Sequence, residues 1–128
     1  MGKGYLMDSN VIIDYLGNKL PIKSAIIIDR LPIVISVITK IEITGRYNAS
    51  KQQIQKIASF TEKAFIYPLS EEIIEQTISI RQKDKIKLPD AIIAATAMVN
   101  NHILVTHNIS DFATLKNLKV IDSWSMQP

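Results

Sequence analysis

Five short apolar runs alternate with longer segments of helical spacing along this chain, and this alternation is what most restricts its fold. The runs cover residues 5–7, 33–35, 64–67, 103–106 and 119–121. Each is rich in branched or aromatic residues, as β-strands are. All but the last are followed by a turn or capping residue and then by a helical pattern. Because strands that alternate with helices form parallel sheets covered on both faces, we predict a three-layer α/β/α sandwich.

Three helices can be located from residue spacing. Residues 50–61 and 70–83 place apolar side chains three and four positions apart, which is typical of amphipathic surface helices. Ser70, with two glutamates behind it, has the character of a helix start. Residues 88–101 differ, because their alanines make a helix thin enough to pack closely against a neighbour. Pro89 suits the first turn of that helix.

Composition and charge restrict the class of protein further. The 128 residues fit one domain, and no repeat or linker divides them, so we expect a single domain over residues 1–128. The absence of cysteine excludes disulfides and thiolate metal sites and favours a cytoplasmic location. No run of 18 apolar residues and no signal sequence occur, so we expect no membrane association. A net charge of +3 permits a polyanionic partner.

Four acidic residues stand in unusually apolar surroundings: Asp8, Glu42, Asp90 and Asp111. Asp8 follows the first strand, Asp111 follows the fourth, and Asp90 opens the helix before the fourth strand. In a parallel sheet such positions gather at the carboxyl ends of the strands. Glu42 lies about 9 Å along the helix after the second strand and must reach back. Taken alone, each acid could have a structural role as a helix cap, a turn residue or an ion-pair partner. Together, the four acids predict one site.

Two aspartates near the N-terminus, Asp8 and Asp14, are expected to have different roles. We expect Asp8, at the end of the strand, to be a ligand of the site, although it could also cap a helix. Ser9 and Asn10 are the better candidates for starting the helix. Asp14 falls about one and a half turns further along, and we place it outside the site.

Several carboxylates in one crevice repel one another, and a divalent cation removes that conflict. Ligands that are all oxygen select hard ions, so the predicted cofactor is Mg²⁺ or Mn²⁺. Three polar residues beside the acids could orient a carboxylate or bind a water of the metal: Ser9, Thr106 and Asn108.

The chemistry that needs such a site is phosphodiester cleavage, in which metal ions activate water and neutralise the phosphate. Four basic residues stand just before the LPDAIIAATA segment: Arg81, Lys83, Lys85 and Lys87. They could hold a nucleic-acid strand through its phosphates. A solvated helix end explains them equally well.

Four segments of the sequence resemble the motif blocks of PIN domains, and especially of the VapC-type toxins of bacterial toxin-antitoxin pairs. They are DSNVIIDYL, SVITKIEITG, LPDAIIAATA and LVTHNISDF, in this order. The resemblance implies a five-stranded parallel sheet of order 3-2-1-4-5 and a magnesium-dependent endoribonuclease that acts on RNA. It also implies a homodimer and a cognate antitoxin protein. By that resemblance Asp8, Glu42, Asp90 and Asp111 are the acidic quartet, with Ser9 and Asn108 as polar companions.

Two residues depart from the family pattern or lie outside it. Many relatives carry arginine where this sequence has His107, which could act as a general acid, contact RNA or be a surface histidine. Trp124, in the tail, could pack on the edge of the sheet or stack on a base.

Other functions remain to be weighed against the ribonuclease. A non-catalytic PIN-like module that binds RNA or protein is the main alternative, and the intact quartet argues against it. A phosphoacceptor receiver domain would carry a lysine after the last strand, where this chain has Asp122 and Ser123. A nucleotide-binding fold is poorer still, because no G-x-G-x-x-G or Walker pattern exists among the four glycines.

Overall fold

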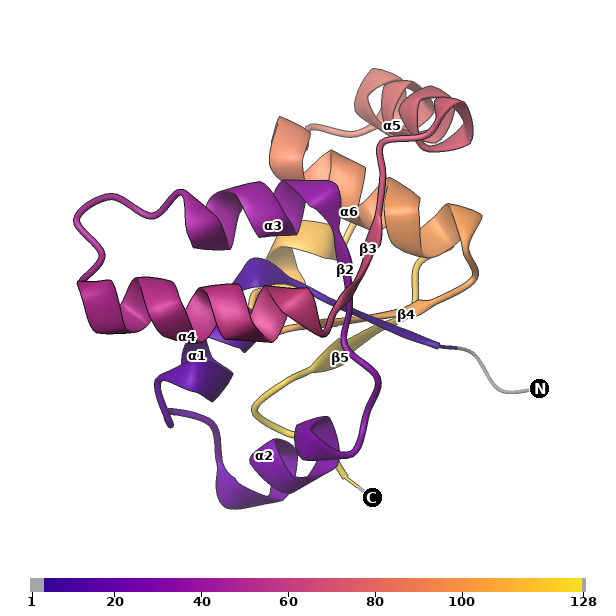
Figure 1. Cartoon of the computed structure of the whole chain (residues 1–128). Helices are drawn as coiled ribbons and strands as arrows, with labels where there is room; N and C mark the ends of the chain where they lie inside the picture. The colour runs from indigo at the N-terminus through magenta and orange to yellow at the C-terminus, as the bar shows by residue number, and fades with distance from the viewer. Residues whose placement is uncertain (1–3, 128) are drawn as a thin grey trace.

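A computed structural model describes residues 4–127, in which strands and helices alternate as predicted (Figure 1). The strands are β1 Tyr5–Met7, β2 Val34–Ser36, β3 Phe65–Tyr67, β4 Ile103–Thr106 and β5 Val120–Asp122. The helices are α1 Ser9–Leu16, α2 Ile22–Asp29, α3 Val37–Thr44, α4 Lys51–Glu62, α5 Glu71–Lys83 and α6 Leu88–Val99, with a 3₁₀ helix, η1, at Ile109–Phe112.

All strand pairs are parallel, but they form two sheets rather than one. Strands β1, β4 and β5 make a three-stranded sheet in that order, and β2 pairs with β3. The prediction of one five-stranded sheet is therefore wrong. Strands β1 and β2 lie in contact, yet no hydrogen-bonded ladder joins them. Each strand has only three or four residues, so a small divergence is enough to break the ladder at this point.

Two hydrophobic cores lie on opposite faces of the strands. Leu6 and Leu104 point into a core formed with α5 and α6, whereas Met7 and Val105 point into a core formed with α1, α2 and α4. This separation follows from the strand geometry, in which successive side chains point to opposite faces. Helices therefore cover both faces, as the alternating pattern predicted (Figure 1).

The predicted strands and the three predicted helices all exist, with ends that differ by at most two residues. Ser70 caps α5 as expected, its hydroxyl accepting the amide of Ile73. Two features were not anticipated: the separate helix α2, and the shortness of η1, the only helical turn between β4 and β5 in the described chain. Within residues 4–127, none of the helices has the length and apolar character that crossing a membrane requires.

A candidate acidic active site

Asp8 stands where β1 ends and α1 begins, and its carboxylate is buried. Its Oδ1 accepts the backbone amide of Ser9 at 2.8 Å, so Asp8 itself is the N-cap of α1. Helix α1 begins at Ser9, as expected, but the side chain that caps it belongs to Asp8 and not to Ser9 or Asn10. Capping uses only one of the two carboxylate oxygens. The structural role and a role in the site are therefore compatible.

The second oxygen of Asp8 is held by two polar side chains. Thr106 donates its hydroxyl to Oδ2 at 2.8 Å, and Asn10 donates Nδ2 to the same atom at 3.0 Å. Thr106 lies at the end of β4, beside β1 in the sheet, and its side chain is fully buried. The carboxylate is consequently fixed in one orientation at the carboxyl ends of the two strands.

Glu42 extends from α3 toward the same edge. The hydroxyl of Ser9 donates to its Oε1 at 2.6 Å, although 33 residues separate the two in the sequence. Glu42 is the sixth residue of α3 and is exposed. Its long side chain thus reaches the first turn of α1, next to Asp8.

Asp90 lies in the first turn of α6 and is partly buried. Burial is the main cause that raises its pKa to about 6, and the charges of Asp8, Asp111 and Glu42 add to the shift. Lys87 opposes it. The pKa of Asp8 is also raised, chiefly by burial, against the hydrogen bonds from Thr106, Ser9 and Asn10. The charges of the other three acids thus act on Asp90, and the charge of Asp111 acts on Asp8. We call this group of four side chains, at the carboxyl ends of the strands, the acidic crevice.

Asp111 lies in η1 and its side chain is exposed. The turn before it is ordered by two bonds: the amide of Asp111 donates to the carbonyl of Asn108, and the amide of Asn108 donates to Oγ1 of Thr106 at 3.1 Å. Thr106 therefore connects Asp8 with the segment that carries Asp111. The side chain of Asn108 itself is exposed.

The donor chemistry of the crevice suits a hard divalent cation, because its charged groups are carboxylates and the pKa values of Asp8 and Asp90 are both raised. Among residues 4–127, no group of three or more His, Cys, Asp or Glu side chains has the arrangement of a metal site. The four acids therefore do not converge on one point.

The four basic residues lie at the end of α5 and in the loop to α6, and all are exposed. Arg81 and Lys83 belong to the last turn of α5, where positive charge also complements the helix dipole. Lys87 precedes α6 and acts on Asp90 electrostatically. We call these four residues the basic segment. It precedes α6 in the chain and so lies next to Asp90 of the acidic crevice.

Sequence reasoning missed a polar cluster around His107. His107 Nδ1 lies 2.9 Å from Oδ1 of Asp122, and the imidazole stacks on the indole of Trp124 with the ring centroids 4.7 Å apart. The indole donates Nε1 to Asp14 at 3.1 Å. Asp122 is partly buried, which opposes the shift, but hydrogen bonds from His107 and Trp124 hold its pKa below the usual value. The residues come from three distant segments, so spacing gave no signal.

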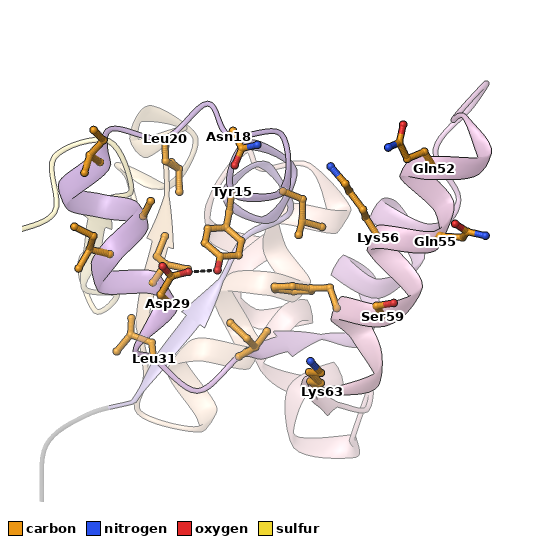
Figure 2. A pocket seen from close by; sticks show the side chains of 17 residues that line it. Tyr15, Asn18, Leu20, Asp29, Leu31, Gln52, Gln55, Lys56, Ser59 and Lys63 are labelled. Carbon is orange, nitrogen blue, oxygen red and sulfur yellow. Dashed lines mark hydrogen bonds between the residues drawn. The ribbon is translucent and has the colours of Figure 1, made fainter.

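A concave region lies between α1, α2 and α4, away from the acids (Figure 2). We call it the apolar groove; its volume is about 1000 Å³. Leu20, Ile26 and Leu31 contribute apolar lining, and Gln52, Gln55 and Lys56 of α4 form the opposite wall. Tyr15 donates its hydroxyl to Asp29 across the groove. None of the four acids of the crevice lines it.

Comparison with known proteins identifies the class that this α/β fold and acidic crevice define. The chain belongs to the PIN domain family, whose model matches residues 5–118. PIN domains are generally nucleases, and they typically use divalent metal ions.

Several similar solved structures are toxin-antitoxin or VapBC complexes. A complex from Klebsiella pneumoniae contains a chain 30% identical to this one, with a TM-score of 0.75 over 96% of this chain and 100% of that chain. VapBC-1 from nontypeable Haemophilus influenzae contains a chain 28% identical, with a TM-score of 0.77 over 94% and 98%. A DNA-bound VapBC from Salmonella typhimurium has the same fold at 19% identity, with a TM-score of 0.79 over 95% and 99%. No curated protein sequence matches significantly.

Proposed function

We propose that this chain is a divalent-metal-dependent endoribonuclease and the toxin of a VapBC-type pair, formed by a single PIN domain over residues 1–128. The observation that carries the proposal is the position of Asp90 at one edge of the strands, where burial and then the charges of Asp8, Asp111 and Glu42 raise its pKa to about 6. Neighbouring carboxylates that repel one another are stabilised when a cation binds between them. Membership of a nuclease family supports hydrolysis of nucleic acid as the reaction.

Asp8, Glu42, Asp90 and Asp111 would hold Mg²⁺ or Mn²⁺, with small movements of the exposed side chains of Glu42 and Asp111. When bound, such an ion activates water and neutralises the charge that develops on a phosphodiester. Thr106 and Asn10 keep Asp8 in place, and Ser9 does the same for Glu42. These hydrogen bonds are made before substrate arrives, so little reorganisation is needed at the reacting centre.

The basic segment supports a nucleic-acid substrate. Arg81, Lys83, Lys85 and Lys87 are exposed on the approach to Asp90, where they would bind phosphates on either side of the scissile bond. Carboxylates alone would repel a polyanion. Cations beside the crevice therefore supply the attraction that brings RNA to it.

We assign the apolar groove to the antitoxin. Ile22 and Ile26, at the groove, are 79% and 45% exposed, and exposed apolar surface around a large concavity is typical of protein binding sites. The similar solved structures are complexes with antitoxins. In the cytoplasm we expect a homodimer whose antitoxin also blocks the acidic crevice with a basic or aromatic segment.

Cleavage of a labelled single-stranded RNA tests the activity. The wild-type protein should cleave it in Mg²⁺ or Mn²⁺, and EDTA should stop the reaction. Asp90→Asn, nearly isosteric but without the charge, should lose cleavage and keep its circular dichroism spectrum. Glu75→Gln makes the same chemical change at an exposed position of α5 and should cleave normally. Cleavage by a highly purified Asp90→Asn protein, or undiminished cleavage in EDTA, would refute the proposal.

A further inference from the structure

We propose that the stacked rings of His107 and Trp124 form a binding platform for one unpaired RNA base at the edge of the acidic crevice. This inference rests on the proposed function, because it takes RNA as the substrate. It adds the contact that would direct cleavage to single-stranded segments at a fixed distance from a bound base.

The two rings are held in place by hydrogen bonds at their edges. Asp122 Oδ1 bonds both Nδ1 of His107 and the backbone amide of Trp124, each at 2.9 Å. Asp14 accepts the indole Nε1 at 3.1 Å. The planes of the rings are 23° apart. A platform fixed at its edges loses little conformational entropy when a base adds to the stack.

The rings remain at the surface although some residues next to them in the chain are buried. Ser123 and Met126, on either side of Trp124, are 0% and 6% exposed, so the tail is anchored against the sheet. Trp124 itself is 40% exposed, and the side chain of His107 is 44% exposed. Packing on the edge of the sheet thus accounts for Trp124 only in part. The tail presents the indole to solvent beside the imidazole.

The platform adjoins the proposed catalytic residues through a short chain of hydrogen bonds. The backbone amide of His107 donates to Oδ1 of Asn10 at 2.9 Å, and Asn10 donates Nδ2 to Asp8 at 3.0 Å. His107 also directly follows Thr106, which binds the same oxygen of Asp8. A nucleotide whose phosphate lies in the crevice would therefore have a neighbouring base within reach of the rings.

Charge decides which part of the RNA the platform suits. Asp14 and Asp122 contact the edges of the two rings, so this region repels a phosphate. A base is uncharged and has a flat face. Stacking of bases on aromatic side chains is the common mode of single-strand recognition and tolerates any base. The basic segment, which precedes Asp90, would bind the phosphates instead.

Binding can be measured without cleavage, because Trp124 is the only tryptophan in the sequence. The Asp90→Asn protein is titrated in Mg²⁺ with a short oligoadenylate while tryptophan fluorescence is recorded. Stacking should quench the emission and shield it from acrylamide. An oligomer of the same length with abasic nucleotides should bind more weakly and quench little. Equal quenching by both oligomers, or none by either, would overturn the proposal.

Substitutions separate the platform from other aromatic contacts, with binding followed by the anisotropy of labelled RNA. Trp124→Ala and His107→Ala should each weaken binding by roughly 5- to 150-fold, the range for loss of one stacked base. Trp124→Phe should retain most of the affinity. Tyr47→Ala removes an aromatic ring that is 98% exposed and should change nothing. Loss of affinity with Tyr47→Ala equal to that with Trp124→Ala would refute a specific platform.

Two further outcomes keep this inference distinct from the proposed function. If wild-type protein cleaves RNA and Trp124→Ala cleaves and binds equally well, the nuclease stands and the platform fails. If RNA quenches Trp124 but no variant ever cleaves, the platform stands and the nuclease fails. Quenching by an arginine-containing peptide with none by RNA would assign the rings to a protein partner and overturn the inference.

Discussion

The acidic crevice and the apolar groove lie in different parts of the molecule and differ in the side chains that form them. The crevice is lined by carboxylates, each of which either accepts a defined hydrogen bond or raises the pKa of a neighbour. The groove has leucine and isoleucine on one side and polar residues of α4 on the other, and Tyr15 makes an exposed hydrogen bond to Asp29 in it (Figure 2). One region holds uncompensated charge, and the other holds uncovered apolar surface.

Both conditions are unfavourable in the isolated protein and favourable in a complex. Like charges in a crevice cost stability until a cation binds. Exposed isoleucines cost stability until another apolar surface covers them. This difference supports the proposed chemistry at the crevice and the proposed protein binding at the groove, and we expect that each can be disabled without the other.

The largest effect is expected from Asp8→Asn. The amide keeps an oxygen for the Ser9 cap but lacks the charge, so Mn²⁺ binding should disappear and RNA cleavage should fall by roughly 1000-fold. Isothermal titration calorimetry and the RNA assay measure the two losses. Asp14→Asn, on the same helix, keeps an acceptor for the Trp124 indole and should bind metal normally. Equal losses in both variants would contradict the assignment of Asp8 to the site.

A substitution in the apolar groove should change antitoxin binding and leave RNA cleavage unchanged. Ile26→Lys places a charge on its apolar lining and should weaken binding of the cognate antitoxin by roughly 10- to 100-fold, as loss of a central interface residue does. RNA cleavage by the free protein should not change. Ile78→Lys makes the same substitution at an exposed position of α5, outside the groove. If both variants bind the antitoxin with the wild-type affinity, the groove is not the docking surface.

The burial of Asp90 and the repulsion from its acidic neighbours should also change the free energy of unfolding. The pKa of Asp90 in the fold, about 6, lies above its ordinary value of 3.8, so the folded protein binds the extra proton and loses stability as pH rises through 6. In EDTA at pH 7.5, Asp90→Asn should therefore unfold at higher urea than wild type. Because Asp90 is partly solvated, we expect a gain on the order of 1 kcal/mol, which vanishes at pH 4. A variant less stable than wild type at pH 7.5 would exclude repulsion at this position.

The smallest effect is expected at the basic segment. Lys85→Ala removes one exposed cation, so RNA affinity should fall by only about 2- to 5-fold, equally for all sequences. The slope of log K against log salt should decrease in magnitude by about one. Lys119→Ala, at an exposed position beside β5, is the matched control. A salt dependence identical in both variants would place the phosphate contacts elsewhere.

Local patterns determined most of the elements. Strands β1 and β4 have the predicted bounds, and α5 begins at its predicted cap, because branched apolar runs and a capping serine act over a few neighbouring residues. The same patterns placed four acids after strands or in first turns. Helix α2 was missed because its isoleucines are followed closely by Pro32 and the next apolar run.

What only the tertiary structure decided concerns pairs that are distant in sequence. Thr106 reaches Asp8 across 98 positions, Ser9 reaches Glu42 across 33, and Trp124 reaches Asp14 across 110. The break between β1 and β2 and the apolar groove have the same origin. Residue type and spacing specify which groups a segment offers, because propensity and capping are local. Which groups meet is set by the packing of helices on both faces of the strands, and no local pattern records it.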